Sequence, residues 1–227
     1  MNFDLNKKKL TLINTFLQNI DHKTNQRSYT ISNPNGNHAI CAGLKQDITI
    51  TIKGHAGYYC AGMNQKAKII IEGNAGTGLA ENMMSGIIHV KGNVSQSAGA
   101  TAHGGTIIID GNASSRCGIS MKGVDIIVKG SVGHMSAFMA QTGSLLVCGD
   151  AGEALGDSIY EANIYLAGKI NSLGADCIEK KMTKTHLKKI NELLKIGNIT
   201  KYKPSDFKRY GSARKLYNFN IDNVSDY

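Results

Sequence analysis

Seven glycines recur at intervals of 19 residues without interruption, and this period limits the possible fold more than any other feature of the sequence. We interpret them as structural turn glycines: Gly54, Gly73, Gly92, Gly111, Gly130, Gly149 and Gly168. A fixed period of this length is typical of repeat architectures, in which each unit packs only against its neighbours. The sequence therefore predicts a solenoid.

The residues around these glycines form columns of constant chemistry. Positions four and two residues before each glycine are β-branched or Leu: Ile50, Ile69, Ile88, Ile107, Ile126, Leu145 and Ile164, then Ile52, Ile71, Val90, Ile109, Val128, Val147 and Leu166. Alternating β-branched residues followed by Gly indicate a short strand that ends in a turn. We expect both columns to point inward and to stack into one core.

A unit of 19 residues has room for two or three short strands, but not for a strand and a helix. The predicted fold class is an all-β solenoid, a right-handed parallel β-helix of seven 19-residue coils with helical or irregular caps at both ends. Leucine-rich repeats are excluded because the LxxLxLxxN spacing is absent. The left-handed hexapeptide β-helix is the alternative, but its coils are built from sixes.

Two further columns describe the turns. The position seven residues after each glycine is always small: Ala61, Ala80, Gly99, Gly118, Ala137, Gly156 and Ala175. We expect this column to mark close approach between coils. The position directly after each glycine holds His55, Asn74, Asn93, Asn112, Ser131, Asp150 and Lys169. Asn and Asp can hydrogen-bond along a stack, so this column predicts a ladder of side chains.

The repeat divides the chain into an N-terminal cap (1–46), the β-helix (47–178) and a basic C-terminal region (179–227). Residues 5–20 carry an apolar stripe typical of an amphipathic helix. Residues 28–31 and 39–41 are expected to be short strands around the Asn33–Gly36 turn. At the other end, Thr183 is expected to begin a helix that Gly197 ends.

This C-terminal helix is predicted to cap the open end of the solenoid, with Lys184, Lys188 and Lys195 on its solvent face. Beyond Pro204 the chain has few periodic signals, and we expect it to fold little alone and to lie on a partner. The candidate partner contacts there are Arg209, Tyr210, Arg214, Tyr217 and Phe219. Aromatic residues and Arg are enriched at interfaces.

Tyr58 and Tyr59 are further candidate partner contacts because they are adjacent aromatic residues at a turn. The column of Tyr58 is otherwise polar and so is expected to face outward. Its members are Tyr58, Thr77, Gln96, Ser115, His134, Glu153 and Ser172.

The net charge of +9 is concentrated at the two ends of the chain. Nucleic acid is disfavoured as a partner, since the sequence contains no nucleic-acid-binding signature and only 6% aromatic residues. No apolar stretch is long enough to span a membrane, and the N-terminus does not resemble a signal peptide. The 5 cysteines, without a CxxC pair, favour free buried thiols in the cytoplasm.

The sequence has no recognisable catalytic constellation. It lacks GxGxxG between a strand and a helix, GxxxxGK[ST], HExxH and GxSxG. Cys60 and Cys117 share a column but lie three coils apart, too far to form a disulfide or to bind one zinc ion. The histidines of the coils fall in different columns. We therefore expect no catalytic, cofactor-binding or metal-binding residue on this chain. Whether the chain is a subunit of an enzyme stays open.

Residues 54–64, GHAGYYCAGMN, and residues 69–76, IIIEGNAG, resemble the GXGXG domain, the β-helical third domain of the glutamate synthase large subunit. The likeness is greatest to its stand-alone form, as in N-methylglutamate synthase (methylamine–glutamate N-methyltransferase). It extends over 47–178 and into SARKLYNF at 212–219. Ser95, Ser114 and Asn171 depart from the Gly-x-x-Gly pattern, which weakens the case for a Gly-lined site.

The resemblance implies a division of labour among chains. A class II glutamine amidotransferase subunit would release ammonia, an FMN and iron–sulfur synthase subunit would use it, and this chain would be the non-catalytic scaffold between them. Three alternatives remain: a C subunit of a formylmethanofuran-dehydrogenase-like complex, a β-helical acyltransferase or lyase, and a basic solenoid that binds nucleic acid or the cell envelope. The sequence does not distinguish ammonia from methylamine as the amine donor.

Overall fold

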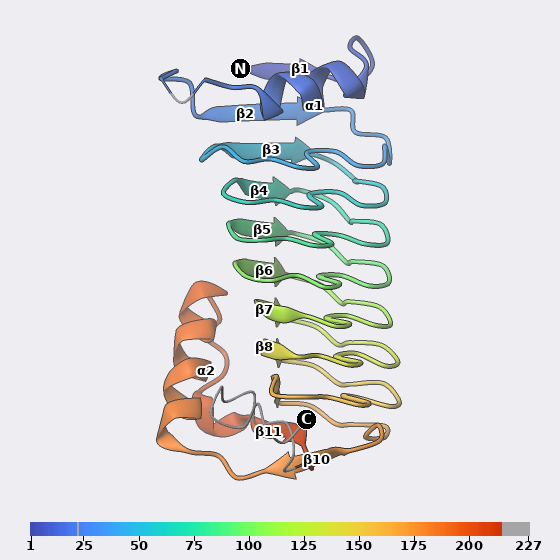
Figure 1. Cartoon of the computed structure of the whole chain (residues 1–227), viewed down its shortest axis with the longest axis vertical. Helices are drawn as coiled ribbons and strands as arrows, with labels where there is room; N and C mark the ends of the chain where they lie inside the picture. Colours follow the sequence, from blue (N-terminus) through green and yellow to red (C-terminus); the bar gives the residue numbers. More distant parts are fainter. Residues whose placement is uncertain (22, 215–227) are drawn as a thin grey trace, which may run out of the picture.

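The structure, a computed structural model, describes residues 1–21 and 23–214 and is a parallel β-solenoid (Figure 1). One sheet runs along it in the order β1-β2-β3-β4-β5-β6-β7-β8-β9-β11-β10. Its strands are β1 (Asn2–Asp4), β2 (Ser28–Ser32), β3 (Thr49–Lys53), β4 (Lys68–Ile71), β5 (Ile87–Val90), β6 (Thr106–Ile109), β7 (Lys122–Val128), β8 (Thr142–Val147), β9 (Asn163–Leu166), β10 (Cys177–Lys180) and β11 (Lys208–Ser212). The helices are α1 (Leu10–Gln18), α2 (Lys184–Ile196) and the 3-10 turn η1 (Pro204–Asp206).

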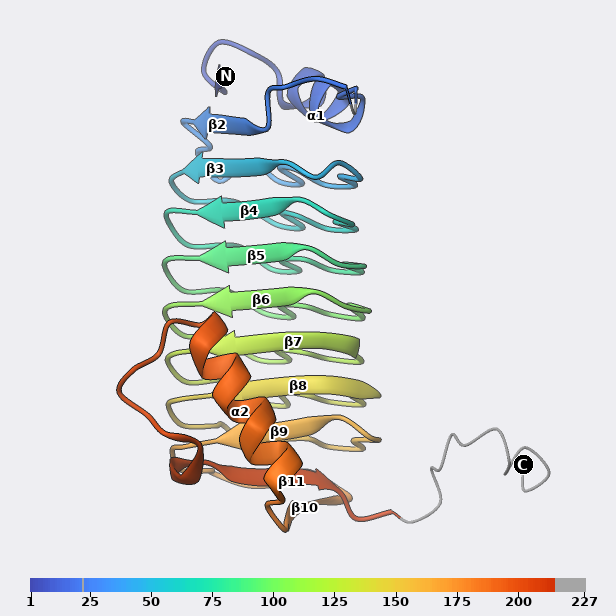
Figure 2. The same cartoon turned by 90° about the vertical axis from the view of Figure 1, so that its left-hand side faces the viewer.

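The 19-residue repeat predicted from the sequence sets the register of this sheet. Each strand from β3 to β8 pairs in parallel with the next, so that Ile50 lies beside Ile69 and Ile69 beside Ile88. Both inward columns are buried throughout the stack. In Figure 2 the strands cross the near face from right to left while the chain descends, which makes the winding right-handed. The predicted parallel β-helix is confirmed.

The turn segment opposite the strands has a conformation that the sequence did not reveal. In the six coils that begin at Gly54 to Gly149, the residues five, seven and nine positions after the glycine all have positive φ. In the first coil these are Tyr59, Ala61 and Met63. The middle N–H, of Ala61, donates to the preceding coil, while those of Tyr59 and Met63 donate to the following one. The alternation lets a strongly curved segment hydrogen-bond in both directions.

The position seven residues after each turn glycine therefore holds a small residue for two reasons. Its members are buried, and their left-handed backbone penalises any residue with a branched Cβ. Ala175 was wrongly assigned to this column: Gly174 donates to Leu155 in the corresponding place, and Ala175 is exposed. The last coil is shortened, so the simple count of 19 fails there.

At the N-terminal end, stacking extends beyond the predicted β-helix. β2 pairs in parallel with both β1 and β3, and α1 lies across the end of the stack with Ile13 and Leu17 buried (Figure 1). The expected strand at Ser28–Ile31 is confirmed as β2. The expected strand at 39–41 is wrong: these residues form a turn, in which Ala39 and Cys41 have positive φ like the turns of later coils.

At the C-terminal end, α2 has the predicted limits but not the predicted position. Thr183 accepts a hydrogen bond from the His186 N–H, and Gly197 is the C-cap. The helix does not cover the open end; it lies along the outer face of the sheet, over β7 to β9 (Figure 2). Its buried residues pack against outward-pointing side chains of the sheet. This second cluster contains Ile108, Ile127, Leu146, Tyr165, Ile190, Leu193, Leu194 and Phe207.

The sheet ends instead with β10 as its edge strand, and β11 inserts between β9 and β10, antiparallel to both. The prediction that the chain beyond Pro204 folds little alone is therefore wrong for residues 204–212. Phe207 and Tyr210 are buried in this segment. Within residues 1–21 and 23–214, no helix is long and apolar enough to cross a membrane.

The small column gives a direct test of the stacking. Gly118 has a φ of +71°, and a Cβ there would lie 3.4 Å from Ile126 Cδ1. We expect Gly118→Val to lower the free energy of unfolding by about 2–4 kcal/mol, because a branched residue must adopt left-handed backbone in a packed core. Gly118→Ala should cost only about 1 kcal/mol, since Ala occupies this column elsewhere.

Both variants are to be measured by urea denaturation, with Lys68→Val on the exposed side of β4 as control. The control should stay within about 0.5 kcal/mol of the wild type. Equal stabilities for Gly118→Val and Lys68→Val would contradict the assignment of Gly118 to a packed left-handed turn.

Candidate functional site

The described residues place no group of three or more His, Cys, Asp or Glu where they could hold a metal ion. The chemically distinctive groups lie instead on the outer surfaces of the coils, in columns. These surfaces are the candidate functional site, and the turn glycines position them. A Cβ on Gly73 would lie 2.7 Å from the Gly54 carbonyl carbon, so consecutive turns approach too closely for a side chain.

The column after these glycines forms the predicted ladder. The side-chain acceptor of each residue receives the backbone N–H of the corresponding residue one coil later, at 2.7–2.9 Å. The acceptors are His55 Nδ1, Asn74 Oδ1, Asn93 Oδ1, Asn112 Oδ1, Ser131 Oγ and Asp150 Oδ1. Lys169 ends the series and needs no acceptor. The ladder fixes the spacing of the coils at their surface.

Removing one acceptor from the ladder should leave one N–H dependent on water. We expect Asn93→Ala to lower the free energy of unfolding by about 0.5–1.5 kcal/mol, because the Asn112 N–H loses its partner. Asn93→Asp keeps an acceptor and should be close to the wild type. The control is Lys169→Ala, in the same column but without an acceptor role. If Asn93→Ala and Lys169→Ala had equal free energies of unfolding, the ladder would contribute nothing to stability.

A second column, one residue before each of the first five glycines, alternates in charge. Lys53 Nζ lies 3.1 Å from Glu72 Oε1, and Lys129 Nζ lies 2.8 Å from Asp110 Oδ1. His89 Nε2 also contacts Asp110, at 3.0 Å. Burial alone would raise the pKa of Asp110, but hydrogen bonds from Lys129 and His89 outweigh it, so the pKa is lowered. Asp110 is therefore a charged partner of its neighbours and not a general acid.

All five cysteines are free and buried. Burial raises the pKa of Cys60 and of Cys117 to about 12, and that of Cys148 and of Cys177 to about 11. Burial also raises the pKa of Cys41 well above its ordinary value. A thiol is nucleophilic as its thiolate, so these groups are poor nucleophiles and poor metal ligands at neutral pH.

The thiols should consequently resist modification in the folded chain. At pH 8 a thiol of pKa about 12 is ionised to roughly one part in ten thousand. We expect Ellman's reagent to label the native chain far more slowly than the chain in denaturant, where all 5 cysteines react. A Ser205→Cys variant, at an exposed position, should add one fast equivalent. Fast labelling of a native thiol would contradict this result.

Tyr58 and Tyr59 lie at the surface, with 51% and 52% of each residue exposed. The Tyr58 ring stacks on His38, with centroids 4.6 Å apart. The Tyr59 ring covers Gly78 of the next coil: a Cβ added to Gly78 would lie 2.6 Å from Tyr59 Cδ1. Each ring therefore packs on one side and presents the other to solvent. Partner contact by these two residues stays a prediction.

Sequence reasoning missed Met63 on the first coil and Met84 on the second, which are also exposed apolar residues. Met63 is 55% exposed and Met84 is 48% exposed. The Met84 N–H donates to the Asn64 carbonyl, which holds it beside the residue that follows Met63. A signal was available, because the column of Met63 holds polar residues in most other coils. Tyr58, Tyr59, Met63 and Met84 together are called the apolar turn patch below.

Two predicted partner contacts belong to the fold itself. Tyr210 is 5% exposed and lies in the main core, so its assignment as a partner contact is wrong. Arg209 is half-buried on the same strand; its Nε donates to Asn163 Oδ1 at 2.7 Å and its guanidinium also reaches the Lys181 carbonyl. Both residues are held by the pairing of β11 with β9 and β10.

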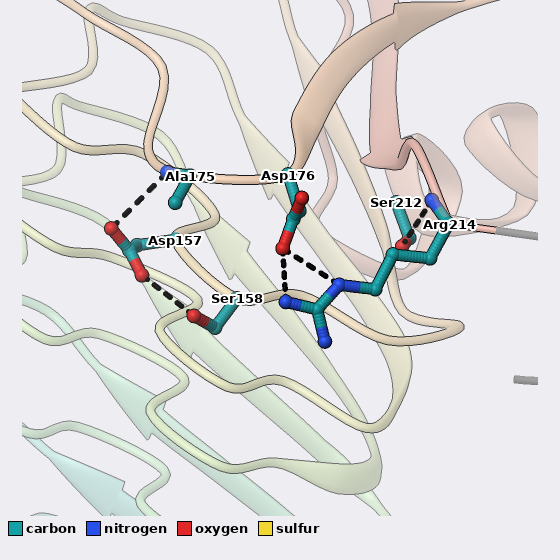
Figure 3. A network of polar contacts seen from close by, with 6 residues as sticks. All are labelled: Asp157, Ser158, Ala175, Asp176, Ser212 and Arg214. Atoms are coloured by element: carbon teal, nitrogen blue, oxygen red, sulfur yellow. Dashed lines mark hydrogen bonds and ion pairs between the residues drawn. The ribbon is translucent and has the colours of Figure 1, made fainter. Parts of the chain in front are cut away.

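Arg214 is held at the end of the described chain (Figure 3). Its side-chain Nε donates to Asp176 Oδ2 at 2.6 Å, and its Nη2 contacts the same oxygen. Its backbone N–H donates to Ser212 Oγ. Nearby, Asp157 accepts from Ser158 Oγ and from the Ala175 N–H. The network ties the chain beyond β11 to the last coil. Tyr217 and Phe219 lie outside the described residues.

The fold and its external ladders define the class of protein, a capped parallel β-solenoid. The GXGXG motif family matches residues 5–220. Protein GlxC of Rhizobium meliloti (strain 1021) is 54% identical over 224 residues, which cover 99% of this chain and 98% of that protein. The chain belongs to the GXGXG family. The resemblance to the β-helical domain of glutamate synthase is thus confirmed, and the chain is related to glutamate synthase.

Proposed function

We propose that this chain is the non-catalytic scaffold subunit of a glutamate-synthase-like complex that forms glutamate or N-methylglutamate. It would join a class II glutamine amidotransferase subunit to an FMN and iron–sulfur synthase subunit. The observation that carries the proposal is that the GXGXG match covers residues 5–220 and thus nearly all of the β-solenoid. The release of ammonia from glutamine and the synthase reaction that uses it are then assigned to other chains.

The physical properties of the solenoid suit this role. Hydrogen bonds join every coil to the next at the strands, at the turns and along the side-chain ladder. The distance between its two ends is thereby fixed, so partners bound to it would be held in a constant relation. Holding them together would keep ammonia or methylamine from escaping between active sites, which is a gain from proximity.

The cofactors are proposed to lie on a partner. Iron–sulfur clusters are usually held by clustered Cys thiolates. The thiols of this chain are instead buried, with raised pKa values. Reduced, buried thiols also suit the cytoplasm, where we place the complex.

The apolar turn patch is proposed as one contact with a partner subunit. Large apolar side chains on a solvated turn are costly to expose, whereas a partner would bury them. Tyr59 and Met63 also occupy left-handed positions, which bulky residues seldom adopt. Tyrosine and methionine are enriched at the centres of interfaces.

Co-expression with a class II glutamine amidotransferase chain and an FMN-binding synthase chain from the same genome tests the proposal. We expect a stable three-chain complex, with glutamine-dependent formation of glutamate or N-methylglutamate only when all three are present. The purified chain alone should be colourless and inactive. A flavin-loaded preparation of this chain, or full activity of the other two without it, would contradict the scaffold role.

The same system tests the patch. Tyr58→Ala together with Tyr59→Ala should weaken assembly at least about tenfold, since aromatic anchors dominate interface energies. Thr77→Ala, in the column of Tyr58 one coil later, is the matched control and should leave assembly unchanged. Wild-type assembly by a folded double variant would remove the patch from the interface and leave the scaffold role standing.

A further inference from the structure

α2 presents two opposite faces of very different chemistry. Ile190, Leu193 and Leu194 are buried against the outer face of the sheet. Lys184, Lys188 and Lys195 are all exposed. At about 100° per residue these three lysines fall within about 40° of one another, on the side away from the buried residues. They are called the α2 basic stripe below.

The stripe is not neutralised by ion pairs within the described part of the chain. Among residues 1–21 and 23–214, none of the three lysines makes an ion pair, and the one carboxylate of the helix, Glu192, does not pair with them. The neighbouring Lys189 shows the contrast, because its Nζ lies 2.7 Å from Asp125 Oδ2. The fold therefore neutralises a lysine on the flank of α2 and leaves the outward stripe uncompensated.

Two of the three charges, Lys184 and Lys188, oppose the stability of the helix, whereas Lys195 lies in the last turn, where the helix dipole favours a cation. Lys184 is the first residue of α2, and the first turn contains no acidic residue. Cations near a helix N-terminus interact unfavourably with the helix dipole, and like charges four residues apart, such as Lys184 and Lys188, repel. Helix stability thus gives no reason for Lys184 and Lys188. A binding partner of opposite charge does.

We propose that the α2 basic stripe docks an acidic surface of a partner subunit, an inference that rests on the proposed scaffold function. A protein surface fits better than a single-stranded nucleic acid, because the nearby aromatic rings that could stack on bases are engaged within the fold. Tyr202 donates its hydroxyl to the Cys148 carbonyl and is half-buried, and Tyr210 lies in the core. A row of lysines without aromatic neighbours favours an electrostatic contact with Asp and Glu side chains.

The site is also well placed for docking. α2 lies over β7 to β9 and leaves the outer face of β3 to β5 uncovered (Figure 2). A partner bound to the stripe would sit beside the solenoid and not at its end. Because the contact is electrostatic, it should weaken as salt rises.

The test uses the full chain with Lys184, Lys188 and Lys195 all changed to Glu. The matched control changes Lys7, Lys9 and Lys23 to Glu, which are exposed in the N-terminal cap and alter the net charge equally. Binding to the purified amidotransferase and FMN chains is titrated at low and at physiological salt. We expect the α2 variant to lose at least about tenfold in affinity for one of them at low salt, with a smaller loss at physiological salt. The control should bind like the wild type.

Folding of the variant is monitored by its melting temperature, which should stay close to that of the wild type because Lys184→Glu is favourable at the helix N-terminus whereas Lys195→Glu is unfavourable in the last turn. Equal affinities for the variant and the control would overturn the docking inference alone. Failure of the wild type to bind either chain would overturn the scaffold function as well. Binding of a short DNA duplex that depends on the three lysines would make nucleic acid the occupant and also overturn the inference.

Discussion

Hydrogen bonding between coils is the constraint on which the rest of the structure depends. A coil of this kind makes few bonds within itself; its N–H and C=O groups are satisfied by the coils above and below. The strands supply one set of bonds, the left-handed turn residues a second, and the side-chain ladder a third. All three require the same register, so a 19-residue period is enforced independently at three places around the circumference.

Much of the fold could be predicted because this constraint places residues of the same type at the same position of every 19-residue unit. The burial of the two β-branched columns, the small column and the ladder all follow from residue types repeated at fixed spacing. The left-handed turn residues could not be predicted, because Tyr59, Arg116 and Met135 are not residues that favour that conformation. Their backbone is imposed by pairing with both neighbours, which a single coil does not reveal.

The ends were harder because they do not repeat. The apolar stripe of α2 indicated a buried face but not the surface that receives it. A signal existed in the outward column that reads Thr51, Ile70 and His89 in the first three coils and then becomes wholly apolar from Ile108 onward. That change marks where the helix lies. For β11, no periodic pattern distinguished a strand that inserts between two others from an extended tail, and Tyr210 was misassigned for that reason.

The side-chain ladder also gives the molecule a direction. Each acceptor belongs to one coil and each donor to the next, so the side-chain bonds all run the same way from His55 to Lys169. Because every link is local, loss or duplication of one whole unit would preserve the remaining links. It would change only the separation of the two ends, by about 4.8 Å, the spacing of neighbouring strands. The number of coils therefore sets the separation of the two ends in fixed steps.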